Sequence, residues 1–183
     1  MSARITCAAL AVLLLQGCGI TMPRYEPSYD NVQALKAREP LAKLDAPSVT
    51  AAPGQDSLMV RANPVRSPEG NLSNHVQKAL ENELRLAGLL QPGAARHLAV
   101  TLRQTELDAA AFGDGKGTLS AEFDLREQDR SLYSSTKTVS SNWDSSFMGA
   151  VAIPRAANAF NPLVTRLLAE LYQDPAFIRA LQQ

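Results

Sequence analysis

The chain has two cysteines, Cys7 and Cys18, and Cys18 ends an apolar run in the stretch LLLQGCGI, residues 13–20. A thiol in this position could form a disulfide, ligate a metal, attack a substrate or carry a covalent lipid. If the segment before Cys18 is removed, Cys7 is lost with it and no second thiol remains for a disulfide. The usual structural zinc site is also excluded, because only His75 and His97 would remain as further nitrogen or sulfur ligands.

Residues 1–17 have the pattern of an export signal. Arg4 supplies one positive charge, and an uncharged, mostly apolar run extends from Ile5 to Leu15. This run is shorter than the about 20 residues that a helix needs to cross a bilayer. We therefore predict that residues 1–17 are a signal peptide and not a membrane span.

The four residues Leu15-Gln16-Gly17-Cys18 resemble the bacterial lipobox, in which an aliphatic, a variable and a small residue precede the cysteine. The resemblance implies that Cys18 is alkylated by diacylglycerol, becomes the first mature residue and is acylated on its new amine. Several acyl chains anchor a protein stably, whereas one does not. Gly19 is not the aspartate that marks inner-membrane retention in many enteric bacteria. The implied location is therefore the cell outer membrane, with the domain lipid-anchored and facing the periplasm.

Composition and motifs argue against several function classes. The chain has 18 basic and 18 acidic residues and no basic stripe, so we predict no nucleic-acid partner. The stretch GDGKGT, residues 113–118, lacks P-loop spacing, and a hairpin turn is expected there. His75 and His97 have no acidic or nucleophilic companion nearby in the sequence, and no serine lies in a nucleophile elbow. We predict a protein that is not an enzyme and that has no cofactor and no metal site.

Five prolines lie between residues 19 and 55. Proline removes a backbone donor and interrupts helices, so the pattern predicts a flexible tether over residues 18–55, with at most a turn or two of helix near residues 32–38. The tether would let a globular domain over residues 56–183 stand away from the membrane.

Residues 56–183 predict an α+β fold with the order β-α-β-β-β-α. Apolar residues recur every three or four positions in residues 74–90 and alternate in the three later strands. The expected elements are a strand at 58–60, a helix at 74–90, strands at 97–107, 118–126 and 131–143, a helix from Pro154 that Pro162 kinks or restarts, and a short helix opened by Asp174-Pro175. Two amphipathic helices should cover one face of a mostly antiparallel sheet in a single domain.

The stretch SSNWDSSFMGAVAIP, residues 140–154, joins the last strand to the long helix. Its side chains Trp143, Phe147 and Met148 could close the end of the core. The alternative is that they form an exposed partner-binding site, in which tryptophan is a favoured residue.

The lipobox, the helix ending in LRLAGLL and the segment WDSSFMGAVAIPRAANAF together resemble small Gram-negative outer-membrane lipoproteins of the YajG type. The layout is also similar to that of the lipoprotein of the lipopolysaccharide translocon and of lipoprotein activators of peptidoglycan synthases. The resemblance implies an accessory or scaffold protein that binds an envelope protein or glycan, and it transfers only Cys18 as a functional residue. The alternative is a lipid- or solute-binding module with a pocket between sheet and helices.

Overall fold

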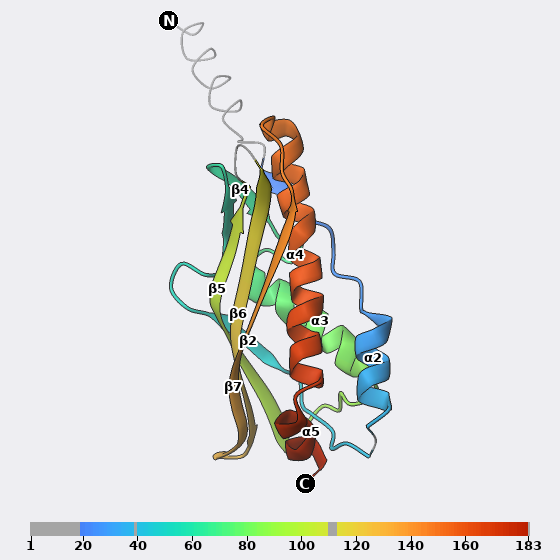
Figure 1. The fold of residues 1–183 in the computed structure, drawn as a ribbon. Coiled ribbons are helices and arrows are strands. Elements are labelled where there is room, and N and C mark those ends of the chain that lie inside the picture. Colours follow the sequence, from blue (N-terminus) through green and yellow to red (C-terminus); the bar gives the residue numbers. More distant parts are fainter. Residues whose placement is uncertain (1–18, 39, 110–112, 183) are drawn as a thin grey trace, which may run out of the picture.

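A computed structural model describes residues 19–38, 40–109 and 113–182, which form an α+β domain with its helices on one face of a sheet (Figure 1). The elements in chain order are β1 (Ile20–Thr21), α2 (Tyr29–Lys36), β2 (Ser48–Ala51), β3 (Leu58–Val60), β4 (Asn63–Arg66), α3 (Leu72–Leu86), β5 (Arg96–Asp108), β6 (Asp114–Glu127), β7 (Arg130–Asp144), α4 (Gly149–Tyr172) and α5 (Pro175–Gln182). The predicted α+β class is confirmed.

The main sheet has the strand order β2-β5-β6-β7. Strands β5, β6 and β7 form the predicted antiparallel meander, in which Val100 pairs with Phe123 and Phe123 with Ser135. Strand β2 was not predicted, and it joins the sheet parallel to β5. A smaller sheet has the order β1-β4-β3, so the architecture contains both parallel and antiparallel pairs.

Helix α3 (Leu72–Leu86) begins and ends slightly before the predicted range of 74–90, and hydrogen bonds cap both of its ends. The Asn71 side chain accepts a hydrogen bond from the backbone N–H of Asn74 at 2.8 Å. At the other end, Gly88 has a φ of 73°, and the Leu89 N–H donates to the Leu84 carbonyl at 2.8 Å. This is the Schellman arrangement, which glycine adopts without steric cost.

Helix α4 differs from the prediction because it contains both prolines. It begins at Gly149, before Pro154, and continues through Pro162 to Tyr172. Proline in a helix interior costs about 3 kcal/mol or more. Ten buried residues of α4, including Phe160, pack into the core, and this burial outweighs the local cost. Among the described residues, no helix combines the length and the apolar character needed to cross a membrane.

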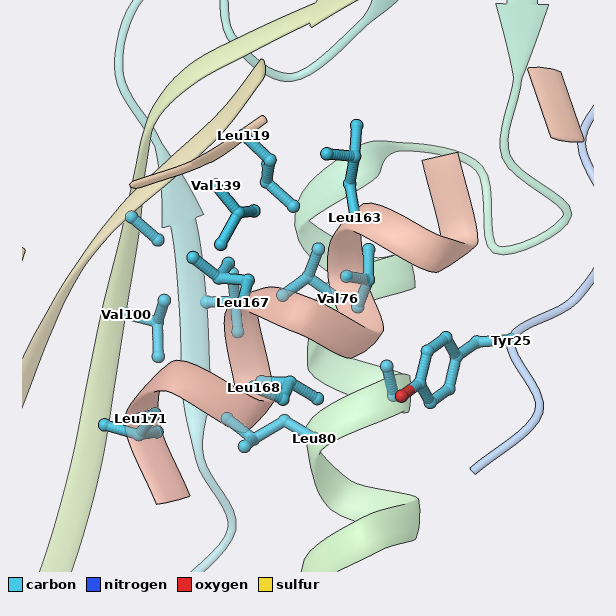
Figure 2. Packing of buried hydrophobic residues seen from close by; sticks show 14 of the residues in the cluster. Tyr25, Val76, Leu80, Val100, Leu119, Val139, Leu163, Leu167, Leu168 and Leu171 are labelled. Atoms are coloured by element: carbon cyan, nitrogen blue, oxygen red, sulfur yellow. The ribbon is translucent and has the colours of Figure 1, made fainter. Parts of the chain in front are cut away.

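The predicted tether is wrong for the described residues between 19 and 55. They form β1, α2 and β2, and they bury Met22, Leu35 and Leu44 at no more than 2% exposure. The prolines interrupt regular structure but do not prevent packing, because their neighbours supply apolar side chains to the same core. Figure 2 shows Tyr25 from this segment beside core residues of α3 and α4.

Asp174 caps α5 as predicted and also binds β7. Its Oδ1 accepts from the Ala176 N–H at 2.8 Å, and its Oδ2 accepts from Lys137 Nζ at 2.6 Å and from the Tyr133 hydroxyl at 2.8 Å. Burial alone would raise the pKa of Asp174, but these hydrogen bonds outweigh it and lower the pKa to about 2. The contact between α5 and β7 therefore stabilises the ionised carboxylate of Asp174.

We expect Asp174→Asn to flatten the acid dependence of stability. Because the folded pKa is depressed, the contribution of Asp174 is present above the unfolded value of 3.8 and is lost as pH falls towards about 2. The contribution should be about 1–2 kcal/mol, allowing for solvent screening. Urea unfolding between pH 6 and pH 2 measures this contribution.

Asp129→Asn, in the exposed β6–β7 turn, is the control and should retain the wild-type dependence of the free energy of unfolding on pH. An equal pH dependence in both variants would contradict the assignment to Asp174.

Candidate functional site

The predicted lipidation residue Cys18 lies outside the described residues, but its neighbour Gly19 is within them. A Cβ built on Gly19 would lie 3.0 Å from Arg66 Nε and 3.3 Å from the Pro64 carbonyl oxygen. Gly19 is followed directly by β1, which pairs with β4. Gly19 therefore lies at the edge of the folded domain, directly before an outer strand of the smaller sheet.

A groove lies between the end of β7 and the first half of α4. Its volume is about 450 Å³. Both of its walls come from regular elements, so the groove is held by the sheet and the helix. It is lined by Ser141, Asn142, Trp143, Asp144, Arg155, Asn158, Ala159 and Pro162, and we call it the β7–α4 groove.

Trp143 lines this groove and packs against the core because β6 carries glycines beneath it. Gly115 is the cross-strand partner of Trp143, and a Cβ on Gly115 would lie only 2.3 Å from the indole Cε2. A Cβ on Gly117 would lie 2.7 Å from Leu163 Cδ1 and 3.1 Å from Trp143 Cζ3. The two glycines thus make room for the indole ring and for α4.

The expected hairpin turn over residues 113–118 is therefore wrong for most of that stretch. Gly113 has a φ of 87° and precedes the strand, but residues 114–118 belong to β6. Glycine in a strand marks close approach of another group, and here that group is an indole ring and a helix.

The outer edge of β7 provides the polar groups of the site. β7 is an edge strand of the main sheet. Arg155 Nη1 donates to the Asp144 carbonyl at 3.2 Å, and Arg166 Nη1 donates to the Ser140 carbonyl at 3.0 Å. Arginines from α4 thus satisfy edge carbonyls on both sides of Asn142. Because these carbonyls already accept hydrogen bonds, they are less able to pair with a strand of another chain. The arginine side chains also place polar groups beside Trp143.

Helix α4 adds a hydrogen-bond acceptor to the same groove. Pro162 has no backbone N–H, so the carbonyl of Asn158, four residues earlier, has no helical donor. Both residues line the groove. The arrangement combines an aromatic surface, exposed amide and guanidinium groups and a backbone acceptor, which suits an amphipathic ligand or a peptide segment.

Phe147 and Met148 lie apart from the β7–α4 groove. They follow β7 in the loop before α4 and are 70% and 62% exposed, whereas Trp143 is only partly exposed. Arg61 fixes this loop, since its Nη1 donates to the Phe147 carbonyl at 3.0 Å and its Nη2 to the Ser146 carbonyl at 2.7 Å. The three residues predicted as one site therefore divide into a core-packed groove residue and two exposed tip residues.

His75 has an acidic and a hydroxyl neighbour in the structure, although no such companion was expected from the sequence. It is fully buried, its Nδ1 lies 2.6 Å from Glu69 Oε2, and its Nε2 lies 2.7 Å from Asn161 Oδ1. Ser67 Oγ lies 3.3 Å from the same Nδ1. A catalytic triad needs the acid and the nucleophile on opposite ring nitrogens, so this Ser–His–Glu set lacks triad geometry.

The His75 network has a structural role instead. Asn161 Nδ2 donates to the Pro23 and Arg24 carbonyls at 3.0 Å each, which orients its Oδ1 towards His75. The network thereby links the N-terminal segment to α4 and α3. In the described ranges, no three His, Cys, Asp or Glu side chains form a group that could hold a metal ion.

Glu83 is a buried acidic residue that the sequence analysis overlooked. It is fully buried on α3 and accepts hydrogen bonds from the Tyr25 hydroxyl at 2.6 Å, the Ser28 N–H at 2.9 Å and Asn31 Nδ2 at 3.2 Å. Burial raises the pKa of Glu83, while these donors oppose the shift. Burial and the Glu83 charge also raise the pKa of Tyr25. The available signal was its position, three residues after Leu80 on the apolar face of the helix.

Comparisons with known proteins establish only the fold. No family model and no curated protein sequence matches the chain. A solved structure from Xanthomonas campestris, whose description names the DUF330 family, has a TM-score of 0.58 and 18% identity, covering 83% of this chain and 91% of the other. A minor lipoprotein from Acinetobacter baumannii has a TM-score of 0.45 and 9% identity, covering 72% and 94%. The resemblance to YajG-type proteins stays a prediction.

Proposed function

We propose that this chain is a lipid-anchored, non-catalytic accessory protein of the bacterial outer membrane that binds an envelope protein in its β7–α4 groove. Two independent features support the proposal. The lipobox supplies the anchor at Cys18, and the groove supplies a surface for a partner.

The observation that carries partner binding is the juxtaposition of Trp143 with a polar strand edge. Tryptophan is enriched among the residues that contribute most to protein interfaces, where a partner covers it and excludes water. The groove is formed by two rigid elements, so a partner would meet a preformed surface and lose little free energy in ordering it. An extended segment lying beside β7 could contact the indole ring and the Asn158 carbonyl together.

A lipid or small solute is the alternative occupant of the same groove. Its volume of about 450 Å³ lies within the range typical of small-molecule sites. The pocket lies between the sheet and a helix, where the solute-binding hypothesis requires it. The two proposals therefore differ in the molecule bound and not in the residues that bind it.

Site-specific photo-crosslinking from Asn158 in intact cells tests the groove. We expect a crosslinker at this exposed position to give a discrete protein adduct. The matched control is Glu170, which is exposed on the same helix about 18 Å further along its axis. A lipid-sized adduct at position 158 would favour the alternative occupant, and identical adducts at both positions would contradict a specific site.

Cys18→Ala tests the anchor separately. The variant should lose acylation and signal cleavage, so that it no longer fractionates with the outer membrane as the mature protein does. Intact mass and membrane fractionation check this result. Unchanged mass and fractionation would contradict the lipoprotein proposal.

A further inference from the structure

One end of the molecule carries three exposed apolar side chains, Met59, Phe147 and Met148, which we call the apolar tip. Their exposed fractions are 55%, 70% and 62%. Arg61, in the turn after β3, donates to the carbonyls of residues 146 and 147, which holds the turn that follows Met59 against the loop that carries Phe147 and Met148. The other large hydrophobic residues that are strongly exposed in the described ranges, Tyr29 and Leu86, line a different pocket.

The N-terminal end of the described chain lies at this tip. β1 runs parallel to β4, which places Gly19 beside Pro64, and Pro64 is the strand partner of Met59. Figure 1 shows β4 and the beginning of α4 at one end of the molecule, and α5 at the opposite end. One peptide unit, about 3.8 Å between Cα atoms, separates Cys18 from Gly19.

A folded segment in place of a tether changes what the anchor does. With a flexible tether, acyl chains on Cys18 would leave the domain free to turn at a distance from the bilayer. With β1 beginning at residue 20, the same chains hold the tip against the bilayer surface. We propose that the apolar tip inserts Phe147, Met148 and Met59 into the interfacial region of the membrane and orients the domain.

This inference rests on the proposed lipidation of Cys18. The charges near Met59 are of both signs, since Arg61, Glu106 and Asp108 line a pocket together with it, so we infer a contact that is apolar and not electrostatic in origin. β7 has 15 residues and ends near the tip, so its first residue, at the β6–β7 turn, lies about 45–50 Å away from the tip. The β7–α4 groove then lies close to the membrane, open to partners in the periplasm.

The test uses the acylated full chain in vesicles of phosphatidylethanolamine and phosphatidylglycerol. Acylated Cys18 has no free thiol and the mature chain has no other cysteine, so Phe147→Cys and Met148→Cys each introduce one site for a nitroxide label. Asp129→Cys, in the exposed β6–β7 turn, is the control. Power-saturation measurements should place the tip labels about 5–10 Å below the headgroup boundary. The label at residue 129 should remain in water.

The outcomes separate the two proposals. An intact mass without acyl chains would overturn the anchor, and this inference with it. Acylated, vesicle-bound protein whose tip labels are as accessible to water as the label at residue 129 would overturn the inference alone. Dipolar broadening between tip labels on different molecules would assign the tip to a second copy of the chain and would also overturn membrane insertion.

Discussion

Replacing Glu83 with alanine is expected to lower the free energy of unfolding by about 3–5 kcal/mol. The substitution leaves the Tyr25 hydroxyl, the Ser28 N–H and the Asn31 amide without their shared buried acceptor. These donors belong to the N-terminal segment, so the loss should fall mainly on the packing of residues 20–36. Denaturant unfolding gives the energy, and hydrogen exchange of the backbone amides locates the loosening.

Glu81→Ala is the matched control for Glu83→Ala. Glu81 lies on the same helix but near the surface, where it accepts from Gln77 Nε2 and pairs with Lys78 at 3.8 Å. Surface pairs of this type contribute about 0–1 kcal/mol. If Glu83→Ala cost no more than Glu81→Ala, or left exchange in residues 20–36 unchanged, Glu83 would not be the group that holds the segment.

Replacing Gly115 with alanine is expected to lower the free energy of unfolding by about 1–3 kcal/mol and to displace the indole ring of Trp143. Alanine normally stabilises a strand relative to glycine, so a loss would oppose the usual trend. The cause is the 2.3 Å separation between the added Cβ and the indole Cε2. Trp143 is the single tryptophan of the chain, so its fluorescence reports the displacement directly.

Two comparisons isolate the Gly115 effect. Gly149→Ala should be neutral or stabilising, because its added Cβ would meet nothing closer than Ile153 Cδ1 at 3.8 Å. In a Trp143→Ala background, Gly115→Ala should lose most of its penalty, as a double-mutant cycle for two contacting residues requires. An undiminished penalty in that background would show that the glycine is needed for another reason.

The sequence predicted the later elements well because their signals are local. The three- and four-residue spacing in α3, the alternation in β5 to β7 and the Asp174-Pro175 opening of α5 all depend on neighbours within a turn or a strand. Buried faces of these elements follow from the same patterns. Helix α4 departed from its local signal, since long-range burial outweighed two prolines.

Of the residues that line the β7–α4 groove, only Trp143 was among the site residues predicted from the sequence. The sequence placed Trp143, Phe147 and Met148 in one segment that joins the last strand to the long helix. In the structure, Trp143 belongs to β7 and lines the groove, whereas Phe147 and Met148 follow the strand and are exposed at the tip. The environment of Trp143 depends on Gly115, 28 positions earlier, and on α4. No local pattern reports a contact of that range.

The sequence by itself determined the anchor motif at Cys18, the α+β class and the elements α3, β5, β6, β7 and α5, because each depends on residues close together in the chain. Tertiary structure alone decided that the described residues between 19 and 55 pack as part of the domain. The segment is held by Glu83, 58 positions from Tyr25, and by Asn161, 138 positions from Pro23. Proline content lowers local helix formation, but contacts with distant buried groups decide whether a segment folds.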